Sequence, residues 1–98
     1  MNKDEAGISL FARRIVKICN QRGLHARAAA RFVKTAGQFN ADIRVRKNGT
    51  EVSGRSIMGL MMLAAAAGTV IELSATGPEA EAAVAALARL IESKFDED

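Results

Sequence analysis

The 98-residue sequence has one cysteine, one proline and one histidine, and it has neither tryptophan nor tyrosine. The single cysteine, Cys19, excludes an internal disulfide and fits a reducing compartment. The longest apolar run, residues 57–67, is interrupted by Gly59 and is too short to cross a bilayer. The start of the chain is polar and mixed in charge, unlike a signal peptide. These features predict a cytoplasmic protein that does not insert into membranes.

Aromatic residues are scarce, since four phenylalanines are the only ones. Hydrophobic residues nevertheless make up 49% of the chain, which is enough for one small aliphatic core. A chain of this length argues for a single domain. We therefore expect one domain over residues 12–98, preceded by a flexible N-terminal extension over residues 1–11.

The charge is unevenly placed along the chain. The net charge is +3 and the sequence pI is about 9.5. Basic residues crowd the first third: Arg13, Arg14, Lys17, Arg22, Arg27, Arg31 and Lys34. A basic face suggests an acidic protein partner, a phosphate or a nucleic acid, although an ordinary solvated surface would show the same composition.

Alternating residues predict four strands. Residues 12–19 form the first, with Val16 and Ile18 on one face. Residues 42–47 and 50–53 flank Asn48-Gly49, a dipeptide that strongly favours a tight hairpin. Ile43, Val45 and Val52 should point inward. Residues 69–75 form the fourth strand.

Helical spacing predicts three helices. Residues 26–36 place Ala29, Phe32, Val33 and Ala36 on one stripe. Residues 56–63 form a short helix with Ser56 as its N-cap. Gly77-Pro78-Glu79 opens the last helix, with proline expected at its first position. That helix has a continuous apolar stripe: Ala80, Val84, Leu87, Ile91 and Phe95. Since amphipathic helices must bury their stripes, we expect one sheet with its helices on one face.

The residues most suited to chemistry are Gly23-Leu24-His25-Ala26-Arg27, at the predicted start of the first helix. A helix start carries free N–H groups and about +0.5 of partial charge, which suits a phosphate. A neutral imidazole can attack and carry a transferred group covalently. Arg27 adds a fixed cation for phosphate oxygens. The alternative is a capping or surface histidine without a chemical task.

This segment, with Ala29-Ala30-Arg31-Phe32-Val33 after it, resembles the active-site segment of the HPr family. HPr is the histidine-containing phosphocarrier of the bacterial phosphoenolpyruvate-dependent phosphotransferase system. A second segment, residues 56–61, resembles the regulatory serine segment of the family at the family's spacing. The resemblance extends from about Ala12 to Phe95. It implies an α+β open-faced β-sandwich of order βαββαβα, with a four-stranded antiparallel sheet and three helices on one face.

The resemblance also implies roles for the residues around His25. His25 resembles the histidine that the family phosphorylates on Nδ1, and Arg27 the arginine that supports the phosphate. Leu24 and Ala26 flank the site, and Arg22 in the preceding loop either strengthens phosphate binding or is simply solvated. The family usually has proline where this chain has Ala28, which puts the rigidity of the site in question, although alanine favours the helix.

The implied activity is that of a phosphoryl carrier and not of a self-sufficient enzyme. The donor would be Enzyme I, and the acceptors would be IIA proteins or domains, in sugar uptake or in a regulatory, nitrogen-type branch. No metal or cofactor is implied. A carrier that visits several partners is more plausible as a monomer.

Ser56 has two interpretations. As an N-cap it stabilises its helix by about 1 kcal/mol. By resemblance it is also a regulatory phosphorylation site, which a dedicated HPr kinase/phosphorylase modifies in part of the family. We expect Ile57, Met58 and Met61 to contact partners, and Met62 and Cys19 to be buried.

A small basic RNA-binding domain is the alternative function. It fits the high pI and the four strands. Recognition of single-stranded RNA, however, usually stacks bases on aromatic side chains, and none of the four predicted strands contains one. The sequence therefore predicts no nucleic-acid partner.

Overall fold

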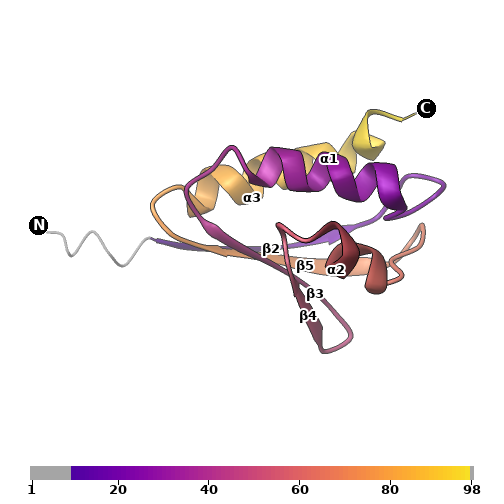
Figure 1. Cartoon of the computed structure of the whole chain (residues 1–98), viewed down its shortest axis with the longest axis horizontal. Coiled ribbons are helices and arrows are strands. Elements are labelled where there is room, and N and C mark those ends of the chain that lie inside the picture. Colours follow the sequence, from indigo (N-terminus) through magenta and orange to yellow (C-terminus); the bar gives the residue numbers. More distant parts are fainter. Residues whose placement is uncertain (1–9, 98) are drawn as a thin grey trace, which may run out of the picture.

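The alternation of apolar and polar residues builds one sheet, which Figure 1 shows. The structure is a computed structural model, and it describes residues 10–97. The elements follow in this order: β2 (Phe11–Lys17), α1 (Ala26–Ala36), β3 (Asp42–Lys47), β4 (Thr50–Ser53), α2 (Ile57–Met62), β5 (Val70–Thr76), α3 (Ala80–Glu92) and the 3₁₀ turn η2 (Lys94–Asp96). The sheet order is β2-β5-β3-β4, and every neighbouring pair is antiparallel.

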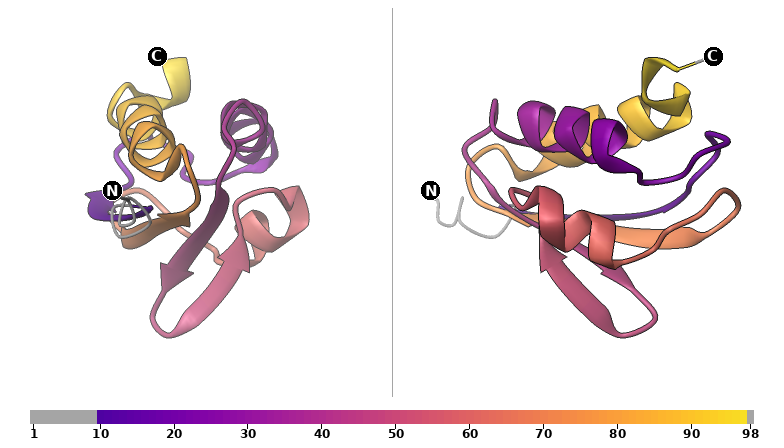
Figure 2. Two further views of the ribbon diagram at one scale, coloured as in Figure 1. Left: turned by 90° about the vertical axis from the view of Figure 1, so that its left-hand side faces the viewer. Right: turned by 45° about the vertical axis from the view of Figure 1, so that its right-hand side comes forward.

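The core lies between the sheet and the helices. Val16 pairs with Ile71 and Val45 with Leu73, and all four side chains are buried on the same face. Figure 2 shows α1 and α3 side by side over that face, with α2 next to β4. The predicted α+β open-faced sandwich is confirmed, and in the described part of the chain the three helices lie on one side of the sheet.

The pattern predicted several boundaries correctly. The first helix and the two hairpin strands have the expected bounds. At the hairpin turn Asn48 and Gly49 both have positive φ, 49° and 83°, as the tight turn requires. The helix α1 begins at Ala26 although Ala28 replaces the family's usual proline.

Other details differ from the sequence prediction. The first strand begins at Phe11, within the predicted extension, so one strand does contain an aromatic residue, with 56% of its surface exposed. Pro78 lies in the turn before α3 and not at its first helical position. Phe95 is buried as expected, but it belongs to η2 and not to the last helix. The remainder of the predicted extension, residues 1–9, lies outside the described residues.

Two residues predicted to be buried are exposed. Met62 is 77% exposed, because α2 is so short that Leu60 alone fills its inward face. Cys19 lies just beyond the end of β2 and is exposed, although its Sγ donates to the Ile91 carbonyl at 3.2 Å. No helix of the described residues combines the length and apolar character that a membrane span requires.

Candidate functional site

The loop that leads from β2 to α1 is fixed by a buried side chain. Asn20 is 1% exposed, and its Nδ2 donates to the Gly23 carbonyl at 2.8 Å. The Gly23 N–H returns a bond to the Asn20 carbonyl at 3.2 Å, and the Leu24 N–H donates to the Ala65 carbonyl at 2.9 Å. The residues before His25 are therefore held against the loop that follows α2.

Gly23 is required by this close approach. Its φ is +64°, and a Cβ atom added there would lie 2.5 Å from the Ala65 carbonyl oxygen and 2.9 Å from the Ala66 Cα. A side chain would push the two loops apart. Glycine thus sets the position from which α1 begins.

His25 occupies the N-cap position of α1, with an extended backbone (φ −74°, ψ 178°). Its carbonyl accepts the first helical bond, from the Ala29 N–H at 2.9 Å. The N–H groups of Ala26, Arg27 and Ala28 therefore precede the helical ladder, and within residues 10–97 no side chain caps them. Such a helix start can bind an anion.

The His25 ring has one engaged nitrogen. Its Nε2 contacts the Glu97 Oε2, while no hydrogen bond among residues 10–97 involves Nδ1. The side chain is 16% exposed and borders a shallow hollow of about 250 Å³, which is also lined by Arg22, Leu24 and residues 64–66. The ring is thus accessible from one side. No set of residues that could hold a metal ion occurs in the described part of the chain.

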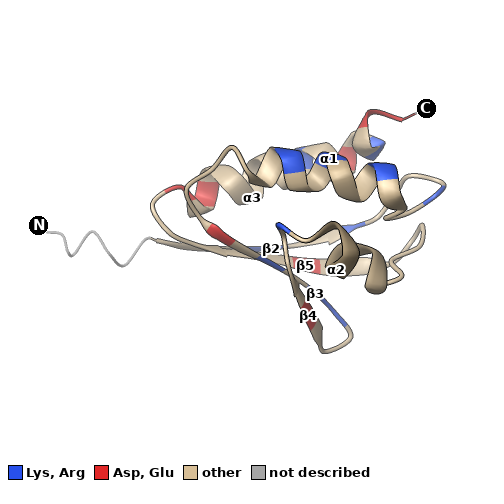
Figure 3. Ribbon diagram, viewed as in Figure 1, with Lys and Arg blue, Asp and Glu red and all other residues tan. Residues whose placement is uncertain are grey.

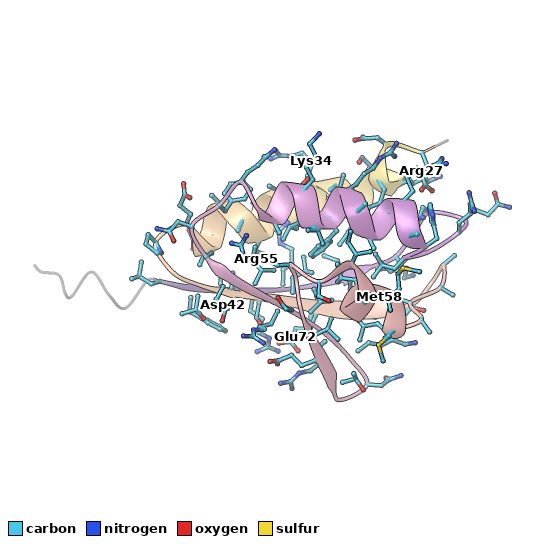
Figure 4. All side chains as sticks on the ribbon, in the orientation of Figure 1. Arg27, Lys34, Asp42, Arg55, Met58 and Glu72 are labelled. Carbon is cyan, nitrogen blue, oxygen red and sulfur yellow. The ribbon has the colours of Figure 1, made fainter. Side chains whose placement is uncertain are left out.

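Three arginines lie within six residues of His25 in the sequence, and they differ in exposure and in hydrogen bonding. Arg22 and Arg27 are exposed, and Arg27 has no ion pair or hydrogen bond with another described residue. Figure 4 shows Arg27 at the start of α1, the end at which a helix carries partial positive charge. Arg31 is half-buried, and its Nη1 donates to the Phe95 carbonyl. Arg27 is therefore available to a phosphate, whereas Arg31 is already engaged.

The sequence analysis missed Glu97. Its Oε1 accepts from the Asn20 Nδ2 at 3.1 Å, and its Oε2 contacts His25. Burial of this carboxyl acts to raise its pKa. The hydrogen bonds from His25 and Asn20, and the charges of His25 and Arg31, lower the pKa by more than burial raises it, so the pKa lies below its ordinary value. Nothing in the sequence signals this contact beyond an acidic chain end.

An unusual backbone brings Glu97 to the site. Lys94, Phe95 and Asp96 have φ values of 60°, 56° and 60°. Left-handed backbone costs about 1–2 kcal/mol per non-glycine residue. The turn is fixed by burial of the Phe95 side chain, by Arg31 on the Phe95 carbonyl, and by the Ser93 hydroxyl, which donates to the Asp96 Oδ1 at 3.2 Å.

Ser56 caps α2 as predicted. Its Oγ accepts from the Gly59 N–H at 2.9 Å, and its carbonyl accepts from the Leu60 N–H at 3.0 Å. The side chain is half-buried in this role. The structure thus explains the serine without any modification.

The outer face of α2 is apolar and exposed. Ile57 and Met61 are each 40% exposed and Met58 is 70% exposed, and the exposed Met62 lies beside them. We call these four residues the methionine patch; Figure 4 labels Met58 within it. The chain that leaves α2 lines the hollow beside His25. The patch and the ring are therefore joined by one short loop.

Comparison with known proteins shows the family of the chain. The family described as "PTS HPr component phosphorylation site" matches residues 12–93. The chain belongs to the HPr family. It is 52% identical over 82 residues to the phosphocarrier protein HPr of Neisseria meningitidis serogroup A, covering 84% of this chain and 92% of that protein. It is 42% identical to the phosphocarrier protein NPr of Shewanella violacea, covering 86% and 92%.

The solved structures of HPr agree as well. HPr from Thermoanaerobacter tengcongensis is 47% identical, with a TM-score of 0.85, and the match covers 89% of this chain and 98% of that one. This HPr-family chain is thus a phosphocarrier component of the bacterial phosphotransferase system, as the two sequence motifs indicated.

Proposed function

We propose that this member of the HPr family accepts a phosphoryl group from phosphorylated Enzyme I on Nδ1 of His25 and passes it to IIA proteins or domains in the cytoplasm. The observation that carries the proposal is the His25 ring at an uncapped helix start, with Nε2 engaged and Nδ1 without a partner among residues 10–97. The protein acts as a covalent intermediate between two enzymes and not as a catalyst by itself.

The local electrostatics favour the phosphorylated state. The helix start stabilises a phosphate by about 0.3–1 kcal/mol, or about 2 kcal/mol when it is partly buried. Arg27 is exposed at the same turn, and its planar guanidinium matches two phosphate oxygens. Arg22 lines the hollow and adds a second positive charge. Leu24 and Ala26 hold the backbone on either side of the ring.

The partners would dock on the methionine patch and the basic residues around it. Exposed methionines adapt their shape, which suits a surface that meets several proteins in turn. The patch carries no charge, whereas the loop before α1 and α1 itself carry arginines (Figure 3). Enzyme I and the IIA proteins are therefore expected to present an apolar surface with acidic residues beside it. The carrier that they bind would be a monomer.

A phosphorylation assay tests the proposal. Incubation with phosphoenolpyruvate and Enzyme I should attach one phosphate that is labile in acid and stable in alkali. The variant His25→Ala should accept none, and a variant that remains folded by circular dichroism but still accepts phosphate would contradict the assignment. Phosphorus–nitrogen coupling in an NMR spectrum of the phosphorylated protein would identify the ring nitrogen.

The final acceptor distinguishes two branches. Similarity to a protein named NPr, as well as to HPr proteins, is compatible with either sugar uptake or a regulatory, nitrogen-type branch. We propose that the phosphorylated protein be offered to sugar-type and nitrogen-type IIA proteins in parallel. Transfer at least tenfold faster to one type would assign the branch.

We also propose that phosphorylation of Ser56 by an HPr kinase/phosphorylase controls this carrier. A phosphate would add about −1.5 to −2 of charge beside the methionine patch and would repel an acidic partner. The helix start would tolerate that charge. Ser56→Asp should therefore bind Enzyme I more weakly than Ser56→Ala, and the difference should shrink at high salt. Equal affinities for the two variants at low salt would argue against control by charge.

A further inference from the structure

The Glu97 carboxylate contacts two side chains, Asn20 and His25, which lie 77 and 72 residues earlier in the sequence. We propose that Glu97 is a positioning residue for His25: it holds the proton on Nε2 and thereby keeps the lone pair on Nδ1, the nitrogen that receives the phosphoryl group. The inference deepens the proposed function and rests on it.

The contacts divide the carboxylate between two partners. Oε1 accepts from the Asn20 Nδ2 at 3.1 Å, and Oε2 contacts the His25 Nε2. Because a carboxylate can only accept, Nε2 must carry the hydrogen. In a neutral ring the other nitrogen is then the nucleophile. Asn20, which also fixes the Gly23 carbonyl, thus aligns the carboxylate and the loop with one amide group.

The approach of Glu97 is built into the fold. The left-handed turn at residues 94–96 is an uncommon conformation for non-glycine residues, and it persists only when its surroundings enforce it. Here the enforcing contacts are the buried Phe95 ring and the bond from Arg31 to the Phe95 carbonyl. Arg31 comes from α1, the helix whose N-cap is His25, so the same helix positions both members of the pair. These two contacts hold the turn that carries Glu97, so the approach of Glu97 to His25 is not a chance contact of an unanchored segment.

The chemistry gives the carboxylate a task during transfer. The Nδ1 lone pair forms a bond to phosphorus while the bond from phosphorus to the donor breaks, and its electron pair leaves with the donor. The ring keeps the Nε2 hydrogen and gains positive charge. A carboxylate on Nε2 stabilises that charge as it develops, in the way that the third member of a nucleophile–histidine–acid triad does. When the phosphoryl group leaves Nδ1 for an acceptor, the ring loses this positive charge and Glu97 keeps its contact with Nε2.

The test compares Glu97→Ala and Glu97→Gln with Glu92→Ala and Glu92→Gln. Glu92 is an exposed carboxylate in the last turn of α3, and its side chain makes no hydrogen bond or ion pair with another described residue. Two measurements are made on each protein. Nitrogen chemical shifts of the unphosphorylated His25 ring report the tautomer, and the rate of phosphoryl transfer from Enzyme I reports function.

We expect the unmodified protein to show a single tautomer with hydrogen on Nε2. Glu97→Ala should give a mixture of tautomers and about a tenfold slower transfer, as expected for loss of a hydrogen bond to a charged group. Glu97→Gln should keep the tautomer, because its amide oxygen can accept the same bond, and should recover part of the rate. Both Glu92 variants should match the unmodified protein.

Three results would overturn the proposal. The first is an unchanged tautomer in Glu97→Ala, and the second is a changed tautomer with an unchanged rate. The third is faster transfer, which would show that the carboxylate obstructs the ring. Failure of the proposed function is separate: a protein that accepts no phosphate, but whose tautomer depends on Glu97, would refute the carrier assignment while the contact itself stood.

Discussion

At the scale of single residues, the site depends on a glycine that no side chain can replace. Gly23→Ala should lower the free energy of unfolding by more than the about 1–3 kcal/mol that a positive φ alone costs, because its Cβ would also meet the Ala65 carbonyl. Gly68→Ala is the matched control, since Gly68 has a φ of +89° but open space around it. Chemical denaturation of both variants separates strain from collision, and equal losses would show that the close approach is unimportant.

Arg27 makes a second prediction at this scale. Arg27→Ala should slow phosphoryl transfer without changing the denaturation midpoint, because the side chain is exposed and contacts no other described residue through a hydrogen bond or ion pair. Lys34→Ala, another exposed basic residue about two turns further along α1, should transfer normally. Equal rates for both variants would show that the backbone N–H groups are sufficient.

At the scale of elements, α2 combines a buried anchor with an exposed surface. Met58→Ala should change the free energy of unfolding by no more than about 0.5 kcal/mol, because Met58 is 70% exposed, and should weaken binding to Enzyme I. Leu60→Ala should instead cost about 2–5 kcal/mol, because Leu60 is fully buried. Titration calorimetry and denaturation measure the two effects, and unchanged binding in Met58→Ala would exclude it from the interface.

The elements also show where sequence patterns suffice. The hairpin strands and α1 were predictable because local rules agree there: alternation, an Asn-Gly turn and a helical stripe all specify the same bounds. The position of His25 at a helix start was predictable because the helical stripe that follows it is visible in the sequence. Met62 was misplaced because a short helix offers two apolar faces in the sequence, and only the packing decides which one is buried. Glu97 has no local signal, since its contacts lie 72 and 77 residues away.

At the scale of the whole molecule, the contacts of Glu97 join the C-terminal turn to the loop before α1, and acid should separate them. The pKa of Glu97 lies below its ordinary value, so the charged form is favoured by the fold. Its contribution to stability is therefore complete above the ordinary pKa of a glutamate side chain and is lost as the pH falls through the lowered pKa.

NMR signals of the Asn20 side-chain amide, followed during acidification, should report this release. In Glu97→Gln the same signals should lack the transition. A transition of the same size in both proteins would assign it to other carboxylates, of which Asp96 and Asp98 are the nearest in sequence.

The position of Cys19 has a practical consequence. It is the chain's sole thiol, it is exposed, and it lies against the end of α3, where the C-terminal turn begins. A maleimide dye would therefore attach at one defined point, six positions before His25. Without any engineered cysteine, its fluorescence could report in real time whether the C-terminal turn moves away from His25 when the ring gains or loses a phosphoryl group.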